Sequence, residues 1–147
     1  MRFINLTALV LILLVTGVHA QSDYSLQEKI YKKAARYGDL GVAKNALYTM
    51  MELKPENTFL MDTLAILYFQ SQAYVQSVLV TNEILEKDPS KISALEIKAI
   101  SESALGYGKE ALNDYEKLYA KTQNVYHLYQ IASLQYQLKR MAEQYQH

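Results

Sequence analysis

Cysteine and tryptophan are both absent from this chain of 147 residues, and proline occurs only twice. The lack of cysteine excludes disulfides, thiolate zinc sites and a cysteine nucleophile. Acidic and basic residues are equally numerous, at 15 each, so no net field attracts nucleic acid or an anionic membrane surface. The composition therefore disfavours a nucleic-acid-binding protein. Half of the residues are apolar, which suffices for one domain with a core.

Sets of side chains at the spacing that catalysis requires are also missing from the sequence. Beyond the N-terminal segment the histidines are His127 and His147, with no carboxylate at metal-ligand spacing. There is no glycine-rich phosphate loop, because Gly106-Tyr107-Gly108 is typical of a turn between helices. We therefore predict a protein that is not an enzyme and that has no catalytic residues, no cofactor and no metal site.

The N-terminus has the three-part layout of a secretory signal. Arg2 precedes an apolar run that is purest from Ala8 to Val15, and Val18-His19-Ala20 ends the segment with small residues. A membrane span needs about 20 apolar residues, whereas polar residues interrupt this run. We predict a signal peptide at 1–20, and no stable membrane insertion after cleavage. The expected destination is a bacterial periplasm or cell envelope, with secretion as the alternative.

Helix-start and helix-stop residues follow the predicted cleavage site. Ser25 and Glu28 form a capping box, which predicts that a helix begins there. Gly38 ends that helix, since glycine enters the left-handed conformation without steric cost. Asp39 is placed to cap the next helix, and Pro55 closes it. We therefore predict that the segment from Ser25 to Pro55 forms a helical hairpin.

The hairpin pattern recurs along the chain. Pro55 and Pro89 are 34 residues apart, and a similar amino-acid sequence precedes each of them. The same interval relates a set of small residues, a set of apolar residues and a set of turn residues. These sets are Ala43, Ser77 and Ala111; Met50, Ile84 and Leu118; and Gly38, Gln72 and Gly106.

This pattern resembles the tetratricopeptide repeat family, whose 34-residue helix-turn-helix units stack into a right-handed superhelix. The resemblance covers about residues 24–147 and implies an all-α solenoid of antiparallel helix-turn-helix repeats. The implied repeats of the domain 21–147 are about 24–57, 58–91, 92–125 and a partial unit at 126–147. The residues that match are Gly38-Asp39 at the turn, the small residues above, Leu47 and Tyr115, Tyr68 and Tyr136, and the two prolines.

Two units depart from the family pattern. Lys98 and Glu102 occupy positions where apolar and tyrosine residues are expected, which predicts looser packing in the third unit. The fourth unit is predicted to have a first helix from Tyr126 to about Lys139, and the sequence contains almost nothing of a second. We expect an apolar stripe on that helix to be uncovered, although Tyr136 is in phase with the core pattern.

The resemblance implies that the first helices form an inner surface that holds a peptide or a partner helix. That surface would be apolar with an acidic edge. The acidic residues are either ordinary solvated charges or contacts for an apolar, partly basic segment. The lysine, asparagine and arginine set that grips a C-terminal carboxylate in part of the family is absent. The expected groove residues are Glu28, Lys32, Asp62, Ile66, Phe69, Glu96, Ile100, Gln130 and Leu134.

The expected function is a non-catalytic interaction or scaffolding module with a protein or peptide partner of unknown identity. The alternative is a structural subunit that docks through the uncovered C-terminal helix, on which Tyr126, Tyr129 and Leu138 are the expected contacts. That docking includes a possible homo-oligomer. A third interpretation is that the chain is a fragment of a longer repeat protein.

Overall fold

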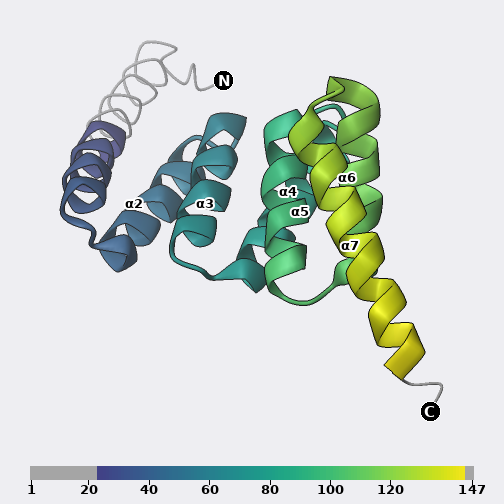
Figure 1. Ribbon diagram of the computed structural model, residues 1–147. Coiled ribbons are helices and arrows are strands. Elements are labelled where there is room, and N and C mark those ends of the chain that lie inside the picture. The colour runs from purple at the N-terminus through teal and green to yellow at the C-terminus, as the bar shows by residue number, and fades with distance from the viewer. Residues whose placement is uncertain (1–22, 145–147) are drawn as a thin grey trace, which may run out of the picture. The chain divides into compact units, whose positions relative to one another are not determined.

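The computed structural model describes residues 23–144, and the predicted signal peptide at 1–20 lies outside this range. Every regular element in the described range is an α-helix (Figure 1). This confirms the all-α prediction. The helical segments are residues 23–37, α2 (Leu40–Leu53), α3 (Thr58–Gln70), α4 (Tyr74–Lys87), α5 (Ile92–Ala104), α6 (Gly108–Thr122) and α7 (Val125–Gln144).

The chain divides into two compact units, Met1–Leu60 and Met61–His147, with the boundary inside α3. In the first unit, residues 23–37 and α2 form a hairpin. The Asp39 carboxylate accepts a hydrogen bond from the Val42 amide at 3.1 Å, which caps α2 as predicted. One face of α2 is buried and supplies this unit's core, through Ala43, Ala46, Leu47 and Met50.

The second unit contains most of α3 and all of α4 to α7. Consecutive helices pack together from α4 through α7, and Figure 1 shows these four helices side by side. A cluster of buried side chains from α5, α6 and α7 forms the core. Among residues 23–144 no helix combines the length and the apolar character that crossing a bilayer requires. The core cluster consists of Leu95, Ala99, Ala111, Tyr115, Leu118, Ile131 and Leu134.

The turn inside each hairpin is built the same way three times. Gly38, Gln72 and Gly106 have positive φ angles of 75°, 57° and 80°. After each of them, the next amide donates to the carbonyl five residues earlier, at 2.9 Å in all three turns. This bond is the mark of a helix that ends in a left-handed residue. The 34-residue interval is therefore a repeat of backbone geometry, which Gln72 adopts without being glycine.

The structure differs from the expectation for α7. The helix continues to Gln144 and does not end near Lys139. Arg140 occupies the place of the turn residue, and arginine favours helix over the left-handed conformation. Tyr136 is 63% exposed, so its predicted place in the core is wrong. Figure 1 shows the last turns of α7 extending beyond the neighbouring helices of the second unit.

Replacing Gln72 by glycine should stabilise the protein by about 0.5–1 kcal/mol. The left-handed conformation costs a non-glycine residue roughly 1–2 kcal/mol, and the extra freedom of glycine in the unfolded chain offsets part of the gain. Urea unfolding followed by circular dichroism measures the change.

The matched control is Gly106→Gln. No heavy atom lies within 4 Å of a Cβ built on Gly106, so this variant tests backbone strain without a clash. It should destabilise the protein by about 1 kcal/mol. A Gln72→Gly variant that is less stable than the parent would show that the turn is not strained.

Candidate functional site

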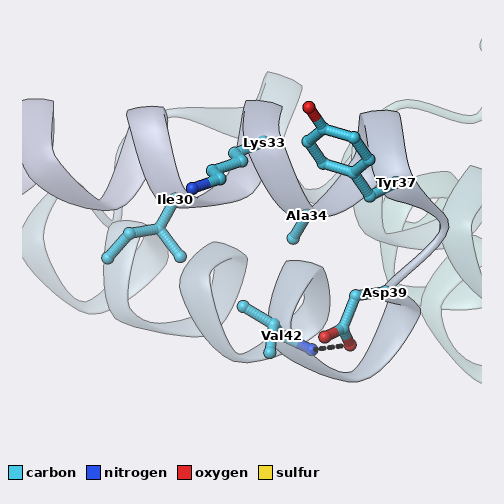
Figure 2. A pocket seen from close by; sticks show the side chains of 6 residues that line it. All are labelled: Ile30, Lys33, Ala34, Tyr37, Asp39 and Val42. Carbon is cyan, nitrogen blue, oxygen red and sulfur yellow. Dashed lines mark hydrogen bonds between the residues drawn. The ribbon is translucent and has the colours of Figure 1, made fainter.

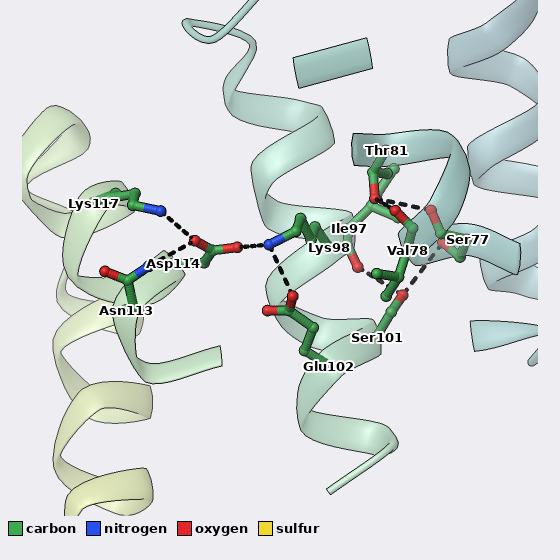
Figure 3. A network of polar contacts seen from close by, with 10 residues as sticks. All are labelled: Ser77, Val78, Thr81, Ile97, Lys98, Ser101, Glu102, Asn113, Asp114 and Lys117. Carbon is green, nitrogen blue, oxygen red and sulfur yellow. Dashed lines mark hydrogen bonds and ion pairs between the residues drawn. The ribbon is translucent and has the colours of Figure 1, made fainter. Parts of the chain in front are cut away.

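A buried network of charges joins α5 to α6 (Figure 3). The Lys98 ammonium donates to the Glu102 carboxylate at 2.8 Å and also to Asp114. Lys117 donates to the second oxygen of Asp114 at 2.7 Å. The side chains of Asp114 and Glu102 are almost fully buried. Lys98 and Glu102, the two residues that depart from the repeat pattern in the third unit, are therefore paired with each other, and Lys98 is also paired with Asp114.

Burial and hydrogen bonding shift the pKa values of Lys98 and Glu102 in opposite directions. Burial alone would lower the pKa of Lys98, but its hydrogen bonds to Asp114 and Glu102 prevail and raise that pKa. Burial raises the pKa of Glu102, and the bond from Lys98 offsets this only in part. The structure therefore holds Lys98 firmly in its charged form.

A signal for this network was present in the sequence. Lys98 and Glu102 are four residues apart and of opposite charge, which places them together on one helix face. The position of Asp114 on the facing helix required the fold. Serine hydroxyls extend the polar contacts, because Ser101 Oγ lies 3.3 Å from Ser77 Oγ, and Ser77 lies 3.4 Å from the carbonyl of Ala65 on α3.

The first helices of the hairpins in the second unit are α3 and α5, and α7 takes the next such position. Six of the predicted groove residues lie on these three helices and are not fully buried. We call this set of residues the first-helix surface. Its apolar members differ in exposure: Ile66 is 43% exposed, whereas Phe69 and Ile100 are partly buried. The first-helix surface consists of Asp62, Ile66, Phe69, Glu96, Ile100 and Gln130.

Both carboxylates of this surface are already paired within the chain. Asp62 accepts a hydrogen bond from Lys91 at 2.6 Å, and this bond raises the pKa of Lys91. Glu96 Oε1 lies 3.0 Å from His127 Nε2. Both carboxylates of the acidic edge expected from the sequence therefore already have a partner within the chain.

Three predicted groove residues lie elsewhere. Glu28 and Lys32 belong to the first unit, where they form an exposed pair at 2.6 Å that lowers the pKa of Glu28. Leu134 belongs to the core cluster and is buried against α5 and α6, so it does not line an open surface. Its position on α7 is in phase with Ile131, which is buried on the same face.

The face of α7 opposite to Ile131 and Leu134 is exposed and rich in tyrosine. Tyr129 and Tyr136 are 68% and 63% exposed, and Tyr126 is half exposed. Leu138 does not belong to this face, because it packs on the other side of α7. A Cβ added to Gly108, the first residue of α6, would meet Leu138 Cδ2 at 3.3 Å. The predicted docking face therefore keeps Tyr126 and Tyr129 and loses Leu138.

His127 is a buried residue whose role the sequence reasoning missed. It is 1% exposed, and its Nδ1 lies 2.9 Å from Thr122 Oγ1. Its Nε2 contacts Glu96, so one imidazole connects α5, α7 and the end of α6. The sequence spacing could have indicated that His127 is buried, because His127, Ile131 and Leu134 follow the four- and three-residue steps of one helix face.

A shallow pocket of about 260 Å³ lies in the first unit, between residues 23–37 and α2 (Figure 2). Ile30, Ala34 and Val42 give it an apolar floor, and Lys33, Tyr37 and Asp39 supply polar atoms. The pocket suits an apolar side chain. No group of three or more histidine, aspartate or glutamate side chains within residues 23–144 is arranged to hold a metal ion.

The sequence matches no protein-family model and no curated protein. Solved structures do match its fold. The tetratricopeptide domain of OM64 from Arabidopsis superposes with a TM-score of 0.65 at 14% identity, covering 80% of this chain and 98% of that one. A tetratricopeptide repeat protein from Parabacteroides merdae has a TM-score of 0.72 at 24% identity, covering 80% of this chain and 48% of that protein.

A third neighbour is the second tetratricopeptide domain of human RPAP3, solved with an HSP70 peptide. Its TM-score is 0.63 at 15% identity, with 79% of this chain and 98% of that one covered. The chain has a tetratricopeptide repeat fold. Within this fold Lys98 and Glu102 of α5 meet Asp114 of α6 in the ion network described above.

Replacing Lys98 by methionine should destabilise the tetratricopeptide fold by about 3–5 kcal/mol, because it leaves the buried carboxylates without their shared cation. Urea unfolding at neutral pH measures the loss. Lys117→Met is the control, since Lys117 contacts the same Asp114 from an exposed position. It should cost less than about 1 kcal/mol. Equal losses in the two variants would contradict a buried network centred on Lys98.

Proposed function

We propose that this protein is a non-catalytic interaction module that binds an apolar peptide segment on its first-helix surface. The observation that carries the proposal is the exposure of a large aliphatic side chain, Ile66, on that surface, which also includes the partly buried Phe69 and Ile100. Apolar side chains in such positions offer area that a partner covers with a gain in free energy.

The fold supports a peptide as the partner. The RPAP3 domain was solved with the peptide SGPTIEEVD of HSP70, and the TPR2B domain of yeast Sti1 was solved in an Hsp70 complex. The Sti1 domain has a TM-score of 0.59 at 20% identity to this chain. Stacked helical hairpins commonly bind extended or helical segments of other proteins.

The charges of this chain favour a partner other than an acidic peptide tail. Lys91 is bound to Asp62, and Lys98 is bound to Asp114 and Glu102, so both ammonium groups already have carboxylate partners. A peptide carboxylate would have to compete with these pairs. Recognition therefore rests on apolar side chains, and charged groups of the partner contribute at the edge.

Selection of peptides from a random library against the mature chain supplies a ligand, and fluorescence anisotropy measures its affinity. Ile66→Glu should weaken binding roughly tenfold or more, because a buried charge without a partner is costly.

Leu79→Glu is the matched control. Leu79 is an exposed aliphatic residue on α4, outside the first-helix surface, and its substitution should leave binding unchanged. A peptide ending in Glu-Glu-Val-Asp should bind poorly to the parent. Equal effects of the two substitutions, or failure to select any peptide, would contradict the proposal.

A second candidate function is that of a structural subunit that docks through α7. This helix is apolar on two opposite faces: Ile131 and Leu134 are buried, whereas Tyr129 and Tyr136 are exposed. A helix with two apolar faces is usually covered on both. The Arg140 guanidinium lies 5.8 Å from the centre of the Tyr136 ring, which supplies a cation at the edge of this face.

If copies of the chain dock through this face, sedimentation of the mature chain should show dimers at high micromolar concentration. Tyr129→Glu should then yield monomers, because a charge at the centre of an apolar contact is desolvated without compensation. Tyr107→Glu, at an exposed tyrosine outside α7, is the control and should leave the association unchanged. A parent that stays monomeric would exclude self-association through α7.

A further inference from the structure

We propose that the pocket of the first unit is a second peptide-binding site, which takes a leucine or aromatic side chain from a partner segment with acidic residues on both sides of it. The proposal goes beyond the function proposed above, because this pocket shares no residue with the first-helix surface. We call it the hairpin pocket, and its lining consists of Ile30, Lys33, Ala34, Tyr37, Asp39 and Val42.

The hairpin pocket is concave and has an apolar base. Figure 2 shows Ile30, Ala34 and Val42 facing one another between the two helices of the hairpin. Val42 and Tyr37 are 43% and 76% exposed, so part of this lining is accessible to a ligand. The pocket has a volume of about 260 Å³, and a cavity of roughly 150 Å³ already holds a benzene molecule. A leucine or phenylalanine side chain therefore fits inside it.

The hairpin pocket lies on a different helix face from the groove that the sequence predicted. Glu28 and Lys32 are the groove residues expected in this unit, and each precedes a pocket residue, Ile30 or Ala34, by two positions. Residues two positions apart on a helix do not share a face. The pocket is therefore a separate site and not an extension of that groove.

A row of exposed basic residues runs beside the pocket. Lys29, Lys33 and Arg36 are spaced by four and three residues, which places them on one face of the helix, and Lys33 also lines the pocket. Within residues 23–144 none of the three forms an ion pair with a carboxylate. The neighbouring Glu28 is paired with Lys32 instead. These three cations, which we call the basic row, are therefore available to carboxylates of a partner.

Asp39 is the one carboxylate in the pocket lining, and it is already used within the hairpin. Its Oδ1 accepts a hydrogen bond from the Val42 amide at 3.1 Å, at the N-terminus of α2. The partial positive charge of a helix N-terminus stabilises an anion there. The positive charge of the basic row is therefore a local feature, although the chain as a whole has 15 basic and 15 acidic residues.

The combination of a concave apolar base and a basic row favours an acidic peptide over an anionic membrane. Apolar side chains that insert into a bilayer protrude from the protein, whereas a concave site receives a side chain from its ligand. Lys29 and Arg36 are separated by roughly 10 Å along the helix, with Lys33 between them. About three residues of an extended peptide cover this distance. Carboxylates one or two residues before and after the apolar side chain would therefore reach the basic row.

The hairpin pocket and the first-helix surface differ in the charge that they select. Lys91 and Lys98 of the second unit have carboxylate partners, whereas the basic row has none within the described residues. A tail such as Glu-Glu-Val-Asp supplies negative charge but only valine as an apolar residue, and this side chain is shorter than that of leucine. Such a tail therefore lacks the group that fills the hairpin pocket.

The first experiment selects peptides from a library with a fixed central leucine or phenylalanine and random flanking residues. The target is the mature chain with Ile66→Glu, so that the first-helix surface does not contribute, and circular dichroism confirms that it is folded. Aspartate and glutamate should be enriched on both sides of the fixed residue. Failure to select any peptide, or enrichment of basic or neutral flanks, would overturn the proposal.

The second experiment measures the affinity of an enriched peptide by fluorescence anisotropy in the same background. Val42→Glu should weaken binding about tenfold or more, because it places a charge against the apolar side chain of the peptide. Val75→Glu is the matched control, since Val42 and Val75 are both exposed valines in the first turn of the second helix of a hairpin. Equal effects of the two substitutions would overturn the assignment of the pocket.

The third experiment tests the basic row. Lys33→Glu should weaken binding of the acidic peptide about three- to tenfold, because it replaces an attraction with a repulsion. Lys109→Glu, at an exposed lysine in the first turn of α6, is the control and should have no effect. A peptide with glutamine in place of its acidic residues should not respond to Lys33→Glu. An equal response of both peptides would refute recognition of acidic residues by the basic row.

The same variants identify two other occupants of the pocket. If the parent sediments with phosphatidylserine vesicles and Lys33→Glu does not, the basic row binds a membrane and the peptide assignment is overturned. If the parent forms dimers that Val42→Glu dissociates, the occupant is a second copy of the chain, and the assignment is again overturned. Because Ile66→Glu removes the first-helix surface from the peptide measurements, their failure leaves the function proposed above standing.

Discussion

A single backbone conformation, the left-handed residue that ends the first helix of a hairpin, sets the register of this protein. Gly38, Gln72 and Gly106 adopt it, and the same 2.9 Å bond closes each turn. Because the turn reverses the chain at a constant interval, the small residues at Ala43, Ser77 and Ala111 are all buried with 0% exposure. Close packing of the helices follows from that placement. Where the conformation is not adopted, at Arg140, the helix runs on and its outer face stays exposed.

The core of the second unit combines this geometry with buried charge. Lys98 stands where the repeat pattern expects an apolar residue, and it remains charged because Asp114 and Glu102 accept its hydrogen bonds. Buried pairs of this kind add little net stability but penalise any arrangement that separates the partners. The network therefore favours one alignment of α5 against α6. His127 and Glu96 add a second polar contact, between α5 and α7.

Much of the architecture was predictable because it depends on local rules. Capping by Asp39, termination at Gly38 and the recurrence of apolar residues each act within a few residues of sequence. The candidate site was less predictable, because its residues meet across helices. Leu134 was expected at a surface and is buried, since the phase of a helix does not say how deeply its neighbours enclose it. Tyr136 shows the reverse, because the helix that would enclose it is not among the described residues.

The sequence by itself determined the all-α class, the 34-residue period and the positions of the hairpin turns, since these follow from backbone preferences of nearby residues. Tertiary structure decided which charges are free. Asp62, Glu96 and Lys98 look alike in sequence as polar residues on first helices, yet each has a partner at least sixteen positions away. Pairing depends on distances between helices, which no local pattern encodes. The chemistry of the surface therefore emerged only once the helices were packed.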